Sequence, residues 1–365
     1  MILTNLRLNN FRNYESREVE FSPDINLIYG NNGSGKTNIL EAISVISNLK
    51  SFRNANDQSM IRWNSEYYYC RGDVSGSDFS RFEVGFYKDD EQSRKKIKID
   101  DYEIKRVSEY YGKMMTVSFV PSDINILGTT PDVRRKYFDS VISKLFPDYI
   151  NDLNRFRDIL NSRNVVLKKI KEGSSNIKHL DVWNRLIAEK ALCIIKKRDD
   201  FINIFSKIFN KSYSIISGES HPPFLFYKPS IKADEIDEIY NTFLSDIKSD
   251  IRRGSTTQGP QRDDYYFINS EGINFLSYSS QGQRRTAAIS LKVAEYEIIK
   301  SMRNKKSIIL IDDIFSELDE IRRFNMIDLL MSEGQLIFTM VNRENFPLDK
   351  IGNIKYFKID NGELI

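Results

Sequence analysis

The spacing of apolar residues predicts a strand, a glycine-rich turn and a helix near the start of the chain. Apolar side chains recur at intervals in the segment Leu3–Leu8, and the run Ile25–Tyr29 predicts a short strand that ends at Gly30. The segment Ile39–Leu49 then repeats its apolar residues at helical spacing.

The segment Trp63–Ile104 is rich in Tyr, Phe and Val that alternate with charged residues. Within it, Arg81–Tyr87 and Lys96–Asp100 have the period of two that is typical of strands. A sheet with such strands has one buried face and one face in water, so we expect an antiparallel lobe here.

The segment Pro131–Ile216 is helical in pattern. One expected helix carries apolar residues at positions 149, 153, 156, 160, 167 and 170, with Arg163 at the interrupted position. After a turn at Gly173-Ser174-Ser175, a second helix repeats the pattern from Trp183 to Ile208. This helical hairpin is either a subdomain packed on the rest of the protein or an arm that projects from it.

An α/β pattern resumes after the hairpin, which makes the hairpin an insertion. The expected elements are two helices, near Gln281–Ile299 and Arg322–Leu330, and four strands, Tyr265–Ile268, Ser307–Ile311, Gln335–Met340 and Lys355–Ile359.

The turn after the first apolar strand has the composition of a phosphate-binding loop. Residues Gly30-Asn31-Asn32-Gly33-Ser34-Gly35-Lys36-Thr37 fit G-x-x-x-x-G-K-[ST] between a strand and a helix. Glycines let backbone N–H groups surround phosphate oxygens, and the helix N-terminus adds positive potential. We expect Lys36 to reach the β- and γ-phosphates of a nucleotide and the Thr37 hydroxyl to bind Mg²⁺.

A second acidic motif follows a strongly apolar strand. The segment Ile308–Ile311 has the composition of a central, doubly covered strand, and Asp312 and Asp313 follow it. Asp312 is placed to hold Mg²⁺, and Asp313 to orient or deprotonate the attacking water. The alternative is that both acids cap a helix.

Ser280 stands immediately before the helix expected from Gln281. It is either an ordinary helix N-cap or part of an anion-binding helix start.

The order of these motifs resembles the head of an ABC-type ATPase. Ser280–Gln283 match its signature motif, and Ser316–Asp319 match its D-loop. The resemblance implies that two heads close around two nucleotides, and that the signature of one subunit completes the ATP site of the other.

The length of the insertion distinguishes between branches of the ABC-type ATPases. About 240 residues separate Lys36 from Ser280, more than in transporter ATPases and far fewer than in the chromosome-maintenance ATPases of the SMC type. A short helical arm of this kind resembles the RecF DNA-repair family.

Further segments resemble motifs of that family, from about Leu6 to Thr339. They are Asn10–Tyr14, Gly30–Ala42, Phe119–Asp123, Arg134–Asp139 and Gly259–Asp264, with Gln261 where the family pattern has His.

The resemblance implies an α/β fold: an ABC-type P-loop ATPase head, with a mixed central sheet and an antiparallel β lobe, and an inserted α-helical arm. The head would comprise residues 1–130 and 217–365, and the arm residues 131–216.

The resemblance also implies a function. The chain would be an ATP-dependent recombination mediator whose ATP-driven dimer clamps duplex DNA or a junction of single- and double-stranded DNA. It would promote recombinase loading in DNA repair and replication, with partners of the RecR and RecO type. Weak, DNA-stimulated ATP hydrolysis would reset the clamp. The alternative is a structural, SMC-like ATPase that organises DNA.

Site residues follow from the motifs and the resemblance together. The expected catalytic residues are Asp313, Lys36, Ser280 and Gln283. The expected nucleotide ligands are Gly30, Asn31, Asn32, Gly33, Ser34, Gly35, Lys36, Thr37, Asn38, Arg12 and Asn13, and the Mg²⁺ ligands are Thr37 and Asp312. Arg12 and Asn13 are alternatively surface residues at a strand end.

Two positions depart from ABC-type ATPases in general. Asp313 stands where most of them carry Glu, which implies slow hydrolysis. Thr339 lies in the segment that carries a switch histidine in transporters.

The charge distribution adds a candidate DNA-binding surface. The whole chain has a net charge of +3, but residues 132–216 contain 18 Lys and Arg against 10 Asp and Glu, a net of +8 that leaves −5 for the rest. Basic clusters of this kind bind DNA phosphates or are simply solvated faces. The expected DNA contacts are Arg53, Arg134, Arg135, Lys136, Lys168 and Lys169. Further clusters lie at Lys196–Arg198 and Arg94–Lys98.

Other classes are disfavoured. Two Cys and two His, without metal-ligand spacing, exclude a disulfide framework and a Cys/His zinc site. No apolar run is long enough to span a membrane, and no export signal follows Met1, so we expect a cytoplasmic protein without a membrane partner. The resemblance to a DNA-repair family implies that the protein is associated with the nucleoid.

Overall fold

The computed structural model describes residues 1–88, 92–128, 130–219, 221–331, 334–342, 353–360 and 362–364, apart from four of their side chains (residues 316, 317, 331 and 364). The chain forms two compact units. We call the first, residues 1–124, 215–218 and 281–365, the head unit, and the second, residues 125–214 and 219–280, the helical unit.

A largely parallel sheet lies at the centre of the head unit, with the strand order β14-β13-β3-β12-β11-β8. Its strands are β3 (Ile25–Tyr29), β8 (Thr116–Phe119), β11 (Ile308–Asp312), β12 (Leu336–Met340), β13 (Ile354–Asp360) and β14 (Glu363–Leu364). All but β14 pair in parallel, and every residue of β11 and β12 is buried. Central strands covered on both faces require such continuous apolar sequences.

A second sheet of the head unit is antiparallel, in the order β2-β1-β4-β5-β6-β7. Its strands are β1 (Ile2–Phe11), β2 (Tyr14–Glu20), β4 (Tyr67–Ser75), β5 (Arg81–Lys88), β6 (Ser93–Ile99) and β7 (Tyr102–Glu103). Burial alternates strictly along β4, so one face of this sheet meets the core and the other meets solvent. The predicted mixed sheet and antiparallel lobe are confirmed.

Helix α1 (Lys36–Asn48) contacts strands of both sheets. It is buried almost all round because it is covered on two sides, and its residues from Ile39 to Ile46 are accordingly apolar or small apart from Glu41. Helix α10 (Gln281–Arg303) packs on β8 at the edge of the parallel sheet.

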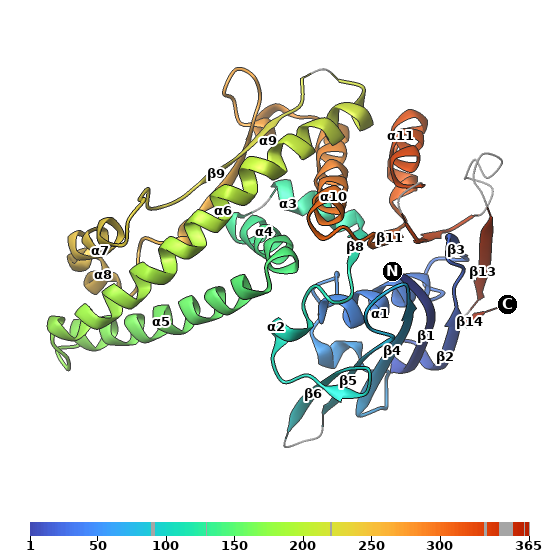
Figure 1. Ribbon diagram of the computed structural model, residues 1–365, viewed down its shortest axis with the longest axis horizontal. Helices are drawn as coiled ribbons and strands as arrows, with labels where there is room; N and C mark the ends of the chain where they lie inside the picture. The colour runs from blue at the N-terminus through green and yellow to red at the C-terminus, as the bar shows by residue number, and fades with distance from the viewer. Residues whose placement is uncertain are drawn as a thin grey trace. The chain divides into compact units, whose positions relative to one another are not determined.

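Two long antiparallel helices dominate the helical unit (Figure 1). They are α5 (Pro147–Lys171) and α6 (Leu180–Ser217), joined by a turn that contains Gly173 in a left-handed conformation. The side chains of Asp152 and Lys190 form an ion pair across the hairpin, with 2.7 Å between Oδ1 and Nζ. The hairpin predicted from the apolar spacing is present.

The interrupted position of the apolar pattern, Arg163, is fully buried in α5. Its guanidinium donates to Asn184 on α6 and to both Asp250 and Thr256, at 2.7 to 2.8 Å. A buried charge is tolerated only when it is paired and hydrogen-bonded, as it is here.

The helical unit extends beyond the expected arm of residues 131–216. Strands β9 (Phe224–Lys228) and β10 (Asp264–Ile268) pair with each other, and β10 packs against α4 (Pro131–Leu145). Residues 219–280 therefore group with the helices, whereas the sequence pattern placed them with the head. The spacing of apolar residues predicts strands in this segment but does not indicate which sheet they join, so it does not reveal that β9 and β10 belong to the helical unit.

The remaining helices are short connections apart from α11. They are α2 (Val107–Tyr110), α3 (Asn125–Gly128), α7 (Ile236–Ser245), α8 (Ile247–Arg253), α9 (Phe275–Tyr278) and α11 (Glu320–Met331), with 3₁₀ turns η1 (Asp57–Met60), η2 (Pro121–Ile124), η3 (Ile177–His179), η4 (Pro260–Arg262) and η5 (Ile314–Glu317). In the described part of the chain, no helix combines the length and apolarity needed to cross a bilayer.

Candidate functional site

The phosphate-binding loop lies between β3 and α1, as expected. Gly30 is at its entrance, where a Cβ atom would lie 2.1 Å from the backbone oxygen of Ile359 on β13. Gly35 has φ = 113°, and a Cβ there would lie 2.6 Å from Nδ2 of Asn13. Close approach and positive φ thus require glycine at both ends of the loop.

Lys36 begins α1 and its side chain lies within the loop. Its Nζ donates to the backbone oxygens of Gly30 and Asn31 at 2.7 and 2.8 Å. Burial lowers the pKa of Lys36 from its usual value, and the carboxylates of Asp313 and Asp312 oppose that shift. Because its Nζ contacts the backbone of the loop, the Lys36 ammonium group lies beside the position that bound phosphates would occupy.

Thr37 and Asp312 are in contact although 275 residues separate them. The Thr37 hydroxyl donates to Oδ1 of Asp312 at 2.7 Å. Asp312 is at the carboxyl end of β11 and Thr37 is in the first turn of α1, at the same edge of the parallel sheet.

The two side chains predicted to hold Mg²⁺ fit that role. They bring a hydroxyl and a carboxylate oxygen together, and oxygen atoms are the ligands that Mg²⁺ prefers. Ser34 of the loop is buried and its Oγ has no hydrogen-bond partner among the described residues, so a phosphate oxygen would satisfy it.

Thr339, in the segment that carries a switch histidine in transporters, completes this cluster. It lies on β12, between β3 and β11, and is fully buried. Its hydroxyl donates to Oδ1 of Asp312 at 2.8 Å and accepts from the backbone N–H of Asp313 at 3.1 Å. One hydroxyl thus positions both acids.

We expect Thr339→Val to lower MgATP affinity about tenfold, because valine keeps the shape of threonine but removes a hydrogen bond to a buried charged group. Titration with a fluorescent ATP analogue measures the effect. Thr339→Ser retains the hydroxyl and is the matched control. Equal affinities of the valine and serine variants would contradict this positioning role.

Asp313 adopts a left-handed conformation, with φ = 48°, immediately after β11. This conformation ends the extended strand at Asp312. Asp312 holds the hydroxyls of Thr37 and Thr339, and Asp313 remains the expected water-positioning residue.

Asn13 and Arg12 form the turn between β1 and β2, next to the loop. Asn13 accepts from the Asn38 amide at 2.7 Å and lies beside Gly35, in keeping with its expected place at the nucleotide site. Arg12 points elsewhere. Its guanidinium binds both carboxylate oxygens of Glu41, at 2.6 and 2.8 Å.

Glu41 is a fully buried carboxylate in α1 for which the sequence motifs predict no role. It accepts from Arg12 and from the Ser51 hydroxyl, and Arg53 lies 3.6 Å away. In this structure Arg12 therefore anchors α1 to the β1–β2 turn. Its contact with the nucleotide stays a prediction.

Ser280 is the last residue of the helical unit, and α10 begins at Gln281. Ser280 is exposed and Gln283 half-buried. In the D-loop segment, Asp319 accepts from the Arg322 backbone N–H at 2.9 Å, so it caps α11; the side chains of Ser316 and Glu317 lie outside the described residues.

The structure corrects the expected DNA contact at Arg134. This residue is buried in α4, and its guanidinium binds both carboxylate oxygens of Asp264 on β10, at 2.8 and 2.9 Å. Arg135 is half-buried and donates to the backbone oxygen of Asp263 at 2.7 Å. Arg134 joins α4 to β10 and is unavailable to a DNA phosphate, whereas Arg135 joins α4 to the residue before β10.

The other expected DNA contacts reach solvent. Lys136, Lys168 and Lys169 are exposed on α4 and α5, although Lys136 pairs with Asp132 in its own helix. Arg53 is partly exposed and binds the Asn38 side chain at 3.1 Å. These four remain predicted DNA contacts.

A family model described as "RecF/RecN/SMC N terminal domain" matches residues 2–350. The chain is 36% identical over 356 residues to "DNA replication and repair protein RecF" of Leptospira interrogans serovar Lai (strain 56601), covering 97% of this chain and 95% of that protein. The chain belongs to the RecF family. A RecF protein of Bacillus mycoides (strain KBAB4) is 33% identical and covers 99% of this chain and 98% of its own.

Solved structures agree with this membership. The "recombination mediator protein RecF-ATP in RecFOR pathway" matches with a TM-score of 0.89 at 32% identity, covering all of this chain and 97% of that one. An SMC head bound to a winged-helix domain of ScpA matches at a TM-score of 0.55 and 14% identity, which shows a shared fold. The ABC-type ATPase head predicted from the motif order is confirmed.

Proposed function

We propose that this RecF family member is an ATP-dependent, DNA-binding recombination mediator. The observation that carries the proposal is the contact between Thr37 and Asp312, which joins the phosphate loop to the acidic strand end as ATP binding requires. A solved relative is titled as a recombination mediator with ATP in the RecFOR pathway, which supports the same role here.

The proposal assigns a role to each group of site residues. The loop from Gly30 to Asn38 surrounds the phosphates, with Lys36 released from its backbone contacts to bind them. Thr37 and Asp312 hold Mg²⁺, which when bound neutralises phosphate charge. Asp313 orients or deprotonates the attacking water.

Ser280 and Gln283 complete the ATP site of a second subunit in this proposal. ATP then drives two heads together, and the dimer clamps duplex DNA or a junction with single-stranded DNA. Weak, DNA-stimulated hydrolysis reopens it. Partners of the RecR and RecO type, a place at the nucleoid in the cytoplasm and a role in recombinase loading belong to the same proposal.

DNA binding with and without ATP, across a salt series, tests the proposal. We expect ATP to raise the affinity for a gapped duplex about tenfold, and the affinity to fall steeply with salt, because lysines displace counterions from phosphates. Fluorescence anisotropy measures both. Binding that ignored ATP would overturn the proposal, and bridging of separate duplexes would favour the structural, SMC-like alternative.

The variant Ser280→Arg tests, in the same experiment, whether Ser280 completes the ATP site of a second subunit. The variant is expected to bind ATP, stay monomeric in sedimentation and lose the ATP-dependent gain in DNA affinity. Ser277→Arg is the matched control, because it adds the same charge to another exposed serine nearby.

A further inference from the structure

Glu41 is the buried end of a chain of polar contacts that leads back to the phosphate loop in the head unit. Its carboxylate accepts from Nε and Nη2 of Arg12, at 2.8 and 2.6 Å, and has no exposed surface. Nη1 of Arg53 lies 3.6 Å from the same carboxylate. A buried acid must be paired and hydrogen-bonded, so these contacts hold both arginines in defined positions.

The contacts beyond Arg53 all have the same donor-to-acceptor direction. The Arg53 guanidinium donates to Oδ1 of Asn38 at 3.1 Å, so the Asn38 NH₂ group faces away from Arg53. That NH₂ group donates to Oδ1 of Asn13 at 2.7 Å. The Asn13 NH₂ group is thereby directed to the loop, where Nδ2 lies 3.4 Å from the backbone oxygen of Ser34.

The orientation of the Asn13 amide matters at a phosphate site. Asn13 is exposed and lies beside Gly35, so a nucleotide at the loop can reach it. An NH₂ group directed at the loop donates to phosphate oxygens, which are acceptors, and hydrogen bonds to charged groups contribute more than neutral ones. The reversed amide would present an oxygen atom to the phosphates and repel them.

Glu41 also holds the backbone that carries Asn13. Arg12 and Asn13 are consecutive residues of the β1–β2 turn. The Arg12 guanidinium binds Glu41 on one side and donates through Nη1 to the backbone oxygen of Ser59 at 2.7 Å on the other. One carboxylate therefore fixes both the turn and, through the contacts of Arg53, the direction of its amide.

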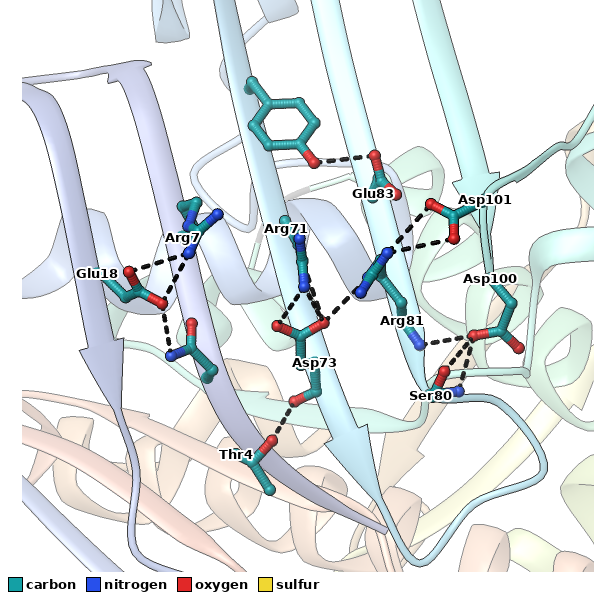
Figure 2. A network of polar contacts seen from close by, with 12 residues as sticks. Thr4, Arg7, Glu18, Arg71, Asp73, Ser80, Arg81, Glu83, Asp100 and Asp101 are labelled. Carbon is teal, nitrogen blue, oxygen red and sulfur yellow. Dashed lines mark hydrogen bonds and ion pairs between the residues drawn. The ribbon is translucent and has the colours of Figure 1, made fainter.

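A second acid of the head unit has two arginine partners but no such connection to the loop. Figure 2 shows Asp73 bound to both Arg71 and Arg81 on the antiparallel sheet, with Arg81 also bound to Asp101. The residues labelled in this network include none of the phosphate loop. The Asp73 side chain is 29% exposed, and ion pairs that reach solvent contribute little. Asp73 is thus a matched comparison for Glu41.

We propose that Glu41 is a positioning residue for ATP binding. Through Arg53 and Asn38 it directs the NH₂ group of Asn13 at the nucleotide phosphates. The inference rests on the proposed function, because it requires ATP at the phosphate loop. It adds a residue that touches no phosphate itself and that affects the affinity for ATP rather than the chemical step.

In the full chain, Glu41→Gln removes the charge and keeps the shape of the side chain. We expect KM for MgATP to rise about tenfold and kcat to stay within about twofold of wild type, because the amide binds ground state and transition state alike. Phosphate release at varied MgATP measures both. Asp73→Asn is the control and is expected to leave KM unchanged. A lower kcat with an unchanged KM would mark a merely structural role and overturn the proposal.

Arg53→Met provides a second variant that leaves the buried bond between Arg12 and Glu41 in place. The Arg53 side chain is 43% exposed, so its replacement does not open the core. We expect KM for MgATP to rise as it does in Glu41→Gln, because Asn38 loses the donor that orients it. Arg81→Met removes a partly exposed arginine that binds Asp73, and is expected to leave KM unchanged.

Asn13→Ala tests the route by removing the amide that the chain of contacts directs. In this background Glu41→Gln and Arg53→Met are expected to raise KM no further, because substitutions that act through one group are not additive. An unchanged KM in both single variants, or a rise that persists in full without the Asn13 amide, would overturn the proposal. A failure of the proposed ATP function is distinct, because the wild-type chain itself would then not bind a fluorescent ATP analogue.

Discussion

Replacing Asp313 by Asn is expected to lower ATP turnover about 100-fold or more while leaving ATP binding intact. The loss follows from removal of the carboxylate that accepts a proton from the attacking water, a contribution of about 10²- to 10⁴-fold in general-base catalysis. Phosphate release at saturating MgATP measures turnover, and sedimentation measures the ATP-bound dimer, which we expect the variant to keep.

The backbone conformation at Asp313 accepts Asn without strain, so the substitution changes only the carboxylate. The residue has φ = 48°, a conformation that Asn adopts as readily as Asp. Its N–H bond to Thr339 does not involve the side chain and survives the change.

Asp101→Asn is the matched control for Asp313→Asn. Asp101 is also left-handed, with φ = 70°, but lies in the turn between β6 and β7 of the antiparallel sheet. Turnover by Asp313→Asn at the rate of this control would remove Asp313 from the chemistry.

Replacing Arg198 by Met is expected to destabilise the helical unit by about 3–5 kcal/mol, the usual cost of breaking a buried ion pair from one side. Arg198 is buried in α6. It binds Asp139 through Nε and Nη2 at 3.0 and 2.9 Å, and Asp263 through Nη1 at 2.8 Å. The variant leaves two carboxylates without their shared cation. Urea unfolding followed by circular dichroism measures the loss.

Lys190→Met is the control for Arg198→Met, because it breaks an ion pair of the same helix that is partly exposed. Its pair with Asp152 is expected to contribute less than about 1 kcal/mol. The structural role of Arg198 would be contradicted if Arg198→Met left the free energy of unfolding unchanged and weakened DNA binding. Arg198 would then be assigned as a DNA contact.

Contiguous motifs allowed much of the site to be predicted. The loop from Gly30 to Thr37 contains its own phosphate-binding geometry, since backbone N–H groups and a helix start need no distant partner. Asp312 was predictable for a related reason: an acid after a buried parallel strand lies at the edge where other such strands also end.

Basic clusters were a poorer guide. Consecutive residues on a helix point in directions about 100° apart, so neighbours in one cluster meet different surroundings. Arg134 is buried while Lys136 is exposed, and Arg198 is buried while Lys196 is exposed. Neighbouring basic residues in the sequence therefore do not form one basic surface, because some of them are buried in ion pairs inside the protein.

The sequence alone determined the elements of this protein, its phosphate loop and its two acids, because those features depend on neighbours along the chain. Only the tertiary structure decided the partners across long separations. It inserted β12 between β3 and β11, which placed the Thr339 hydroxyl against Asp312. It also paired Arg134 with Asp264, 130 residues away. Such contacts depend on strand order and helix packing, which no local pattern specifies.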